Sequence, residues 1–154
     1  MLSAWRIVKR RYAGQAFDGD GARLYGGRWH SPGRAVVYVS ESRALATLEV
    51  LAGLQSSAVV PAYVLIRVEF DAALVQRADL ASLPQQWKQS PPTSETQQIG
   101  DAWLEAAGSV ALRAPSAVVP DEYNYLLNPR HPDFKFVRVG SPEELYIDPR
   151  LLPH

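Results

Sequence analysis

One stretch organises this chain: Gly26-Gly27-Arg28-Trp29-His30-Ser31-Pro32-Gly33, followed without a break by residues 34–54. Gly26 and Gly27 can adopt positive φ angles and let another backbone or a ligand approach closely. Arg28 therefore projects from a sharply bent segment. The tripeptide Ser31-Pro32-Gly33 predicts a turn, because proline fixes φ and glycine permits the left-handed position. A turn and then a strand follow the glycines, whereas a dinucleotide-binding loop leads into a helix.

The residues after this turn predict a strand and then a helix. Residues 35–39 form a short β-rich run that carries Tyr38. Ser40-Glu41-Ser42 is a helix-start signal, because a serine oxygen can accept from the free amides of a first helical turn. We expect a helix over 43–54, with an apolar stripe of Leu45, Leu48, Leu51 and Ala52. Glu49 lies at the edge of that stripe, so we expect its carboxylate to be half buried beside the strand.

The remaining chain predicts many short strands and few helices. We expect strands over 4–8, 63–70, 110–113, 117–119 and 135–139. A second helix is predicted over 94–107, where Ser94 and Gln97 form a capping-box pattern and Gly108 ends the helix. Residues 71–83 are weakly helical, 53–61 and 85–93 are expected as loops, and 121–131 are polar and irregular. Strands and helices do not alternate regularly, so the sequence predicts an α+β fold, a compact single domain over 1–154 with a mixed or antiparallel sheet.

Composition narrows the class of protein. The chain has 154 residues, with 16 Lys+Arg and 16 Asp+Glu, so its formal net charge is zero. Zero net charge argues against nucleic acid as the main partner, because phosphate backbones are bound by clustered cations. The absence of cysteine excludes disulfides and thiolate metal sites, and His30, His131 and His154 are not spaced as metal ligands. The sequence has neither a signal-peptide core nor an apolar run of membrane-spanning length, so we expect a cytoplasmic protein.

Three residues around the organising stretch suggest chemistry: Arg28, Tyr38 and Glu49. An arginine can clamp a phosphate through paired donors, and a tyrosine offers an aromatic face. A carboxylate can stabilise the positive charge that develops on a sugar during glycoside cleavage. The same residues are equally compatible with a buried Arg28–Glu49 ion pair beside a core tyrosine. Arg6, which lies between two apolar residues of the first predicted strand, needs an anion or a carboxylate.

Several motifs spread over nearly the whole chain are specific when taken together. They are Trp5-Arg6-Ile7, Gly21-Ala22-Arg23-Leu24-Tyr25-Gly26-Gly27-Arg28-Trp29, Val37-Tyr38, Ala44-Leu45-Ala46, Leu48-Glu49-Val50-Leu51, Pro115-Ser116 and Asn124-Tyr125-Leu126-Leu127-Asn128-Pro129. With these motifs the chain resembles the RES-domain family, toxins of bacterial type II toxin–antitoxin modules that are paired with Xre-type antitoxins. The resemblance implies a compact relative of ADP-ribosyltransferases that consumes NAD⁺ as its substrate and needs no metal.

The resemblance also assigns residues to the site. Arg28 corresponds to the family arginine, Glu49 to the glutamate and Ser116 to the serine, with nearby Ser109 as the other candidate for that serine. Arg6, Tyr38 and Asn124 match further substrate-binding positions. The chain departs from the family at His30, where asparagine is usual after Gly-Gly-Arg-Trp. We expect this change to be tolerated, although it can alter how the turn is held.

The function implied by the resemblance is growth arrest through cleavage of the nicotinamide–ribose bond of NAD⁺, by a glycohydrolase or a phosphorylase. In that interpretation Arg28 and Arg6 hold the pyrophosphate and Tyr38 packs against the nicotinamide or its ribose. Glu49 binds the ribose hydroxyls, and Ser116 orients the ligand. An Xre-type helix-turn-helix antitoxin would be the partner and would carry the DNA binding. The alternatives are a mono-ADP-ribosyltransferase that modifies a specific host protein, and a non-catalytic nucleotide-binding or interaction module.

Overall fold

The computed structural model describes residues 1–54 and 61–152. Three α-helices, α1 (Asp20–Tyr25), α2 (Arg43–Gly53) and α3 (Ser94–Ala106), are found in this part of the chain. The strands are β1 (Leu2–Lys9), β2 (Val37–Ser40), β3 (Tyr63–Phe70), β4 (Val75–Arg77), β5 (Ala111–Pro115), β6 (Tyr123–Leu127), β7 (Arg138–Val139) and β8 (Glu143–Glu144). Short 3₁₀ helices cover Arg10–Gln15, Ala72–Leu74, Leu80–Ser82, Pro132–Phe136 and Pro149–Leu151.

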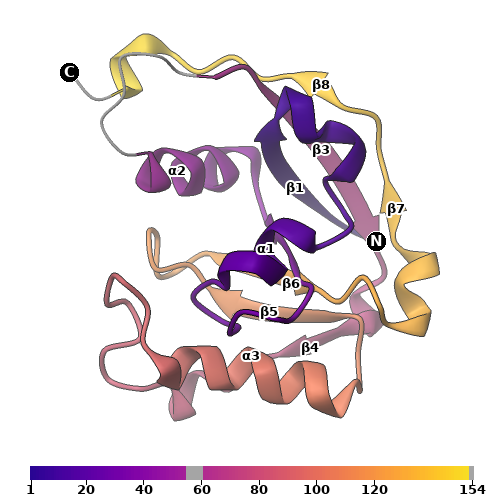
Figure 1. Ribbon diagram of the computed structural model, residues 1–154, viewed down its shortest axis with the longest axis vertical. Helices are drawn as coiled ribbons and strands as arrows, with labels where there is room; N and C mark the ends of the chain where they lie inside the picture. The colour runs from indigo at the N-terminus through magenta and orange to yellow at the C-terminus, as the bar shows by residue number, and fades with distance from the viewer. Residues whose placement is uncertain (55–60, 153–154) are drawn as a thin grey trace.

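All strands belong to one sheet with the order β4-β5-β6-β2-β1-β3-β7, and β8 pairs with β3 beyond that path. Only the β4–β5 pair is parallel among these strands; the others are antiparallel. Figure 1 shows α2 beside the β1–β3 part of the sheet and α3 beside the β4–β5–β6 part, with α1 between them. The expected α+β fold with a mixed sheet is confirmed.

The sheet is weakly joined in its middle. β1 pairs with β3 over eight positions, from Leu2 opposite Phe70 to Lys9 opposite Tyr63. Between β1 and β2, in contrast, only Trp5 and Ser40 form a pair. Since ladder hydrogen bonds hold neighbouring strands together, the two halves of the sheet can splay apart where the ladder is this short. A cavity lies beside this short pairing, between α2 and the turn that follows α1.

Two apolar clusters stabilise the sheet, and the first spans both of its halves, since it contains residues of β1 and β3 as well as of β2, β5 and β6. One contains Val37, Val39, Phe70 and Tyr125, with the last two rings in an edge-to-face contact of 5.3 Å between centroids. The other lies under α3 and contains Trp29, Trp103, Leu112 and Leu126. β2 and β6 supply side chains to both clusters, because successive residues of a strand point to opposite faces of the sheet. The central strands are therefore fixed from both sides.

The predicted elements with strong local signals are present. The helix expected over 43–54 is α2, and the Ser42 hydroxyl accepts from the Leu45 amide at 3.0 Å, as the helix-start signal predicted. The strand expected over 63–70 is β3, and the helix expected over 94–107 is α3. The strand expected over 35–39 begins two residues later, at Val37.

Other predictions about elements were wrong. Residues 71–83 form two 3₁₀ turns around β4 where a weak helix was expected. Residues 117–119 form no strand, because the amides of Val118 and Val119 both donate to the Ser116 hydroxyl at 3.0 Å and turn the chain. The segment 121–131 contains β6, whose pairing with β2 and β5 outweighs its polar residues. Residues 132–136 are a 3₁₀ helix, which leaves β7 as the only part of the strand expected over 135–139. Most of the loop expected over 53–61 lies outside the described residues.

Two details of the helices also differ from expectation. Leu48 of the predicted stripe is 40% exposed, and α2 buries Leu45 and Ala46 instead. At α3 the N-cap residue is Thr93, which makes no side-chain cap hydrogen bond. The predicted capping box is not formed, because the Gln97 amide donates to the Gly27 carbonyl at 3.1 Å. Gln97 thus holds the organising turn against α3.

Candidate active site

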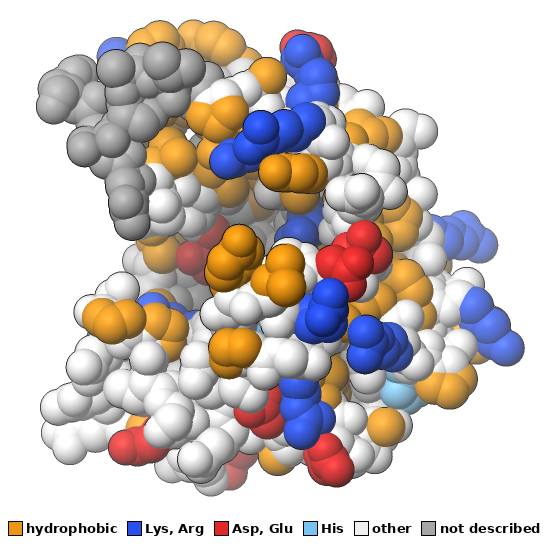
Figure 2. Space-filling view, in the orientation of Figure 1, with side chains coloured by type: hydrophobic (Ala, Val, Ile, Leu, Met, Phe, Trp, Pro, Cys, Tyr) orange, Lys and Arg blue, Asp and Glu red, His pale blue; other side chains and the backbone are white. Residues whose placement is uncertain are grey.

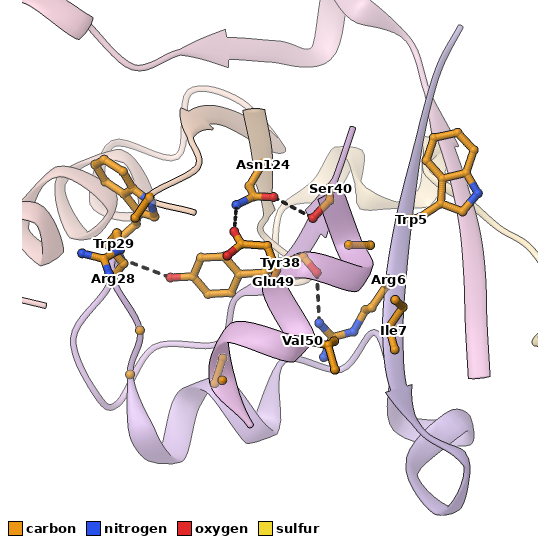
Figure 3. A pocket seen from close by; sticks show the side chains of 16 residues that line it. Trp5, Arg6, Ile7, Arg28, Trp29, Tyr38, Ser40, Glu49, Val50 and Asn124 are labelled. Atoms are coloured by element: carbon orange, nitrogen blue, oxygen red, sulfur yellow. Dashed lines mark hydrogen bonds between the residues drawn. The ribbon is translucent and has the colours of Figure 1, made fainter. Parts of the chain in front are cut away.

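A cavity of about 590 Å³ opens where the two halves of the sheet separate. In Figure 2 the surface is hollowed at the left, between the α2 side and the α3 side of the molecule. β1, α1, the turn that follows it, β2, α2 and β6 all contribute to the walls. The polar side chains that line the cavity are Arg6, Arg28, Tyr38, Ser40, Glu49 and Asn124. Figure 3 shows these side chains together.

The Arg28 wall is the turn that follows α1. Gly26 has a φ of 71°, a left-handed conformation that glycine adopts without strain. One guanidinium nitrogen of Arg28, Nη1, donates to the carbonyls of Trp87 at 2.9 Å and Gln89 at 2.7 Å. Burial lowers the pKa of Arg28, and the charge of Glu49 opposes that shift. Within residues 1–54 and 61–152 no ion pair joins Arg28 to Glu49, so Nε and Nη2 are left for a ligand.

Tyr38 and His30 form a hydrogen-bonded pair behind this wall. His30 is fully buried, with Nε2 2.8 Å from the Ala22 carbonyl and Nδ1 2.6 Å from the Tyr38 hydroxyl. A carbonyl only accepts, so Nε2 carries the proton and Nδ1 accepts from the tyrosine. The Tyr38 oxygen in turn accepts from the Trp29 amide at 3.3 Å. The hydroxyl of Tyr38 is thus occupied, and burial raises its pKa, so the residue offers the cavity an uncharged ring.

Gly27 shows how tightly this pair is packed against the turn. A Cβ atom at Gly27 would lie 2.8 Å from the Tyr38 hydroxyl oxygen and 3.1 Å from Cε1 of His30. The second glycine of the pair is therefore needed for close approach. The histidine that departs from the usual asparagine does hold the turn, through a side chain that the resemblance gave no role.

Two nitrogens of Arg6 bind backbone carbonyls. Its Nε donates to the Ala16 carbonyl at 2.6 Å, and Nη1 donates to the Tyr38 carbonyl at 3.0 Å. Burial lowers the pKa of Arg6 to about 10, partly offset by Asp18, so the side chain stays charged at neutral pH. Arg6 thus ties β1 to β2 at the point where the ladder between them is shortest.

The Glu49 wall is a chain of side-chain hydrogen bonds. The Asn124 amide nitrogen donates to Glu49 Oε2, and the Ser116 hydroxyl lies 3.4 Å from the same oxygen. Ser40 Oγ lies 2.6 Å from Asn124 Oδ1. Figure 3 shows this chain running from Ser40 through Asn124 to the carboxylate. No described residue donates to Oε1, so that oxygen can receive a ligand hydroxyl.

The two candidate serines are separated by the fold. Ser116 lies beside Glu49, whereas the Ser109 hydroxyl accepts from the Trp103 indole at 2.9 Å and donates to the Ala111 carbonyl at 3.0 Å. Ser109 therefore joins the end of α3 to the start of β5 and takes no part in the Glu49 wall. Sequence reasoning missed Ser40, although its place at the end of a predicted strand, just before the helix that carries Glu49, was a usable signal.

Over 1–54 and 61–152, no three His, Asp or Glu side chains are grouped so that they could hold a metal ion. In the same part of the chain, none of the helices is both long and apolar enough to cross a membrane.

Known proteins resemble this chain over almost its whole length. The RES domain family matches residues 3–148. The chain is 38% identical over 151 residues to "Toxin Res" from Yersinia enterocolitica serotype O:8 / biotype 1B, covering 97% of this chain and 99% of that protein. It is 34% identical over 155 residues to "Prs ADP-ribosylating toxin" from Sphingobium sp. strain YBL2, covering 97% and 96%. A solved structure, the M. tuberculosis MbcT–MbcA toxin–antitoxin complex, shares the fold with a TM-score of 0.76 at 19% identity, over 94% of this chain and 84% of that one. The chain therefore belongs to the RES domain family, together with these toxins.

Proposed function

We propose that this protein is the toxin of a toxin–antitoxin module and that it cleaves the nicotinamide–ribose bond of NAD⁺. One observation carries the proposal: a carboxylate anchored through one oxygen faces a cavity whose opposite wall holds an arginine with free donors. The cavity volume of about 590 Å³ lies within the range of small-molecule sites. Relatives named as toxins support the toxin part of the proposal.

We assign each residue a role from the donor and acceptor atoms that it leaves available to a ligand. Arg28 Nε and Nη2 bind the pyrophosphate, because a guanidinium matches phosphate oxygens through paired donors. Tyr38 supplies a ring face against the nicotinamide or its ribose. Arg6, whose Nε and Nη1 are bound to carbonyls, supports the strand that carries Tyr38. Asn124 and Ser116 hold the Glu49 carboxylate for the ribose hydroxyls.

Cleavage of the nicotinamide–ribose bond then requires mainly that the positive charge on the ribose be stabilised. The bond between the nicotinamide nitrogen and the ribose anomeric carbon breaks, and its electron pair leaves with neutral nicotinamide. The ribose develops positive charge, which the Glu49 carboxylate stabilises. Water or phosphate forms the new bond to the anomeric carbon, and an attacking water gives up a proton to solvent. The first acceptor makes the protein a glycohydrolase and the second a phosphorylase.

Purified protein incubated with NAD⁺, with and without inorganic phosphate, tests the proposal. We expect nicotinamide release together with ADP-ribose in the absence of phosphate, or ADP-ribose 1″-phosphate in its presence. Folded protein that binds NAD⁺ but releases no nicotinamide under either condition would contradict the enzymatic proposal and favour a nucleotide-binding module.

A second candidate function is mono-ADP-ribosylation of a host protein. It is favoured by the 34% identity to a protein named as an ADP-ribosylating toxin, which covers 97% of this chain. The same cavity would then pass the ADP-ribosyl group to a side chain instead of to water. Incubation of cell extract with labelled NAD⁺ distinguishes the two: one labelled protein band is expected for a transferase, and labelled small molecules alone for NAD⁺ degradation.

We further propose an Xre-type helix-turn-helix antitoxin as the partner, acting with this chain in the cytoplasm, where its substrate is found. The zero net charge of the chain leaves DNA binding to that partner. Expression of the chain alone should arrest growth and lower cellular NAD⁺, and co-expression of the neighbouring antitoxin gene should restore both. Arrest with unchanged NAD⁺ would favour the transferase, and no arrest from folded protein would contradict the toxin proposal.

A further inference from the structure

We propose that Ser40 is a positioning residue for Glu49, acting through the side chain of Asn124. Ser40 was not among the residues that the sequence or the family resemblance assigned to the site. It lies at the end of β2 and is buried. Its hydroxyl donates to the Asn124 side chain, which in turn donates to the Glu49 carboxylate. The kinetic part of the test rests on the proposed function, whereas the spectroscopic part does not.

The Glu49 carboxylate determines the direction of both hydrogen bonds in the series Ser40–Asn124–Glu49. An ionised carboxylate accepts and cannot donate, so Asn124 must turn its amide nitrogen toward Glu49. The amide oxygen then faces Ser40 at 2.6 Å and can only accept, so the Ser40 hydroxyl must donate. Hence Ser40 is the group that distinguishes the functional orientation of Asn124 from the flipped one, in which the amide oxygen would face the carboxylate.

The backbone places Ser40 for this task. Ser40 is directly opposite Asn124 in the β2–β6 ladder and opposite Trp5 in the only β1–β2 pair. Its Cα is thus fixed from both sides at the point where the sheet splits. Asn124 is 8% exposed and Ser40 is 5% exposed, so water has little access to replace either hydrogen bond. A buried amide oxygen without a donor is unfavourable, which gives the hydroxyl its effect.

Glu49 depends on its hydrogen bond from Asn124 because its other contact, with Ser116, is weak. Ser116 is 3.4 Å from Oε2, at the long limit for a hydrogen bond, and its oxygen already accepts from the amides of Val118 and Val119. The carboxylate itself is only partly buried on α2. Loss of the Asn124 contact therefore frees the glutamate to rotate within the cavity.

Steady-state kinetics on five variants test the proposal. Ser40→Ala should lower kcat/KM for NAD⁺ about 10- to 100-fold, mainly through kcat, as expected when one hydrogen bond that orients a charged group is lost. Ser40→Thr keeps the hydroxyl and should recover most of the activity. In an Asn124→Ala background, Ser40→Ala should have no further effect. Ser3→Ala, which removes a β1 hydroxyl that binds Arg67, is the matched control and should leave activity unchanged.

Each kinetic outcome decides for or against the proposal. Additive losses in the double variant would show that Ser40 acts on substrate directly and not through Asn124, which would overturn it. Wild-type activity of folded Ser40→Ala would also overturn it. If Ser40→Ala does not fold, Ser40→Cys carries the same comparison, because a thiol of similar shape is a weaker donor.

Nuclear magnetic resonance of the Asn124 side-chain amide gives a result that does not depend on NAD⁺ turnover. In the wild-type protein its two N–H signals should be widely separated and slow to exchange, because one proton binds a carboxylate. Ser40→Ala should collapse this separation, as should Glu49→Ala, whereas Ser40→Thr should keep it. An unchanged spectrum in Ser40→Ala would overturn the positioning role even if NAD⁺ proves not to be the substrate.

Discussion

On the Arg28 wall of the cavity, the turn after α1 is held by close packing and by hydrogen bonds of both its backbone and its side chains. The Ser31 amide and hydroxyl donate to the Asp101 carboxylate at 3.0 and 2.6 Å, and the Gly27 carbonyl accepts from Gln97. On the Glu49 wall, the chain from Ser40 to the carboxylate consists of side-chain contacts alone. α3 supports the first wall, whereas β2 and β6 support the second.

This difference predicts which substitutions should lower stability and which should lower activity. The first wall includes the packing between the turn and α3, so changes to its packed residues should destabilise the protein, whereas the Arg28 side chain reaches the cavity and can be changed without unfolding. The second wall consists of polar side chains beside an open cavity, and their replacement leaves the apolar clusters intact. Stability and activity should therefore separate between the two walls, and the following predictions are ordered by the size of the expected effect.

The largest effect on stability is expected for Gly100→Ala in α3. A Cβ atom at Gly100 would lie 1.7 Å from the Trp29 carbonyl oxygen, so α3 and the turn would have to move apart. We expect a loss of about 3 kcal/mol in the free energy of unfolding, measured by urea denaturation. Gly108→Ala, just beyond the same helix and in open space, is the control and should stay within about 0.5 kcal/mol. Equal stability of the two variants would refute the packing account of the Arg28 wall.

Arg28→Lys should weaken NAD⁺ binding without unfolding the protein. Lysine keeps the charge but loses the planar fork that can hold two carbonyls and a phosphate together. We expect a loss of about 1–3 kcal/mol in binding free energy by calorimetry, measured in a Glu49→Gln background to prevent turnover. Arg23→Lys on the neighbouring helix α1 is the charge-matched control. Unaltered affinity of Arg28→Lys would move the arginine out of the phosphate site.

A smaller, pH-dependent effect is expected from His30. Burial lowers its pKa below the ordinary 6.5, although the Ala22 carbonyl and the charge of Asp101 oppose the shift. The Tyr38 hydroxyl lies 2.6 Å from the other ring nitrogen. Above about pH 6.5, His30 is neutral in both the folded and the unfolded chain, and its contribution to the free energy of unfolding does not change with pH. Below it, the unfolded chain binds a proton that the native state does not, so stability falls by up to about 1.4 kcal/mol per pH unit.

Replacement of His30 by asparagine isolates this contribution. Asparagine can still accept from Tyr38 but does not titrate. The free energy of unfolding of His30→Asn should therefore fall less steeply than that of the wild type between pH 6.5 and pH 5. Parallel curves over this range would show that His30 contributes nothing to the acid sensitivity of the Arg28 wall.

Local signals in the sequence predicted those parts of the fold that depend on neighbours in the chain. Ser42 caps α2 as expected, and the strand expected over 63–70 is β3. The glycine pair predicted a sharp bend, because a positive φ at Gly26 is a property of the residue itself. The expected position of Glu49 at the edge of the buried side of α2 followed from helical periodicity.

Features that depend on distant pairing could not be predicted in the same way. Asn124 meets Ser40 across 84 positions of sequence, and only the register of β2 with β6 places them opposite each other. The same register turns a polar-looking segment into a central strand. Arg6 is a third case, because two of its nitrogens bind the carbonyls of Ala16 and Tyr38, and residue types alone do not predict such contacts to the backbone.

The most direct test of the account compares turnover and stability in a single variant, Glu49→Gln. Glutamine keeps the size of the side chain and can still accept from Asn124, but it removes the charge that matches a developing ribose cation. The account predicts NAD⁺ turnover lowered by about 100-fold or more, with a Tm nearly equal to that of the wild type. Folded Glu49→Gln protein that turns over NAD⁺ at the wild-type rate would contradict it.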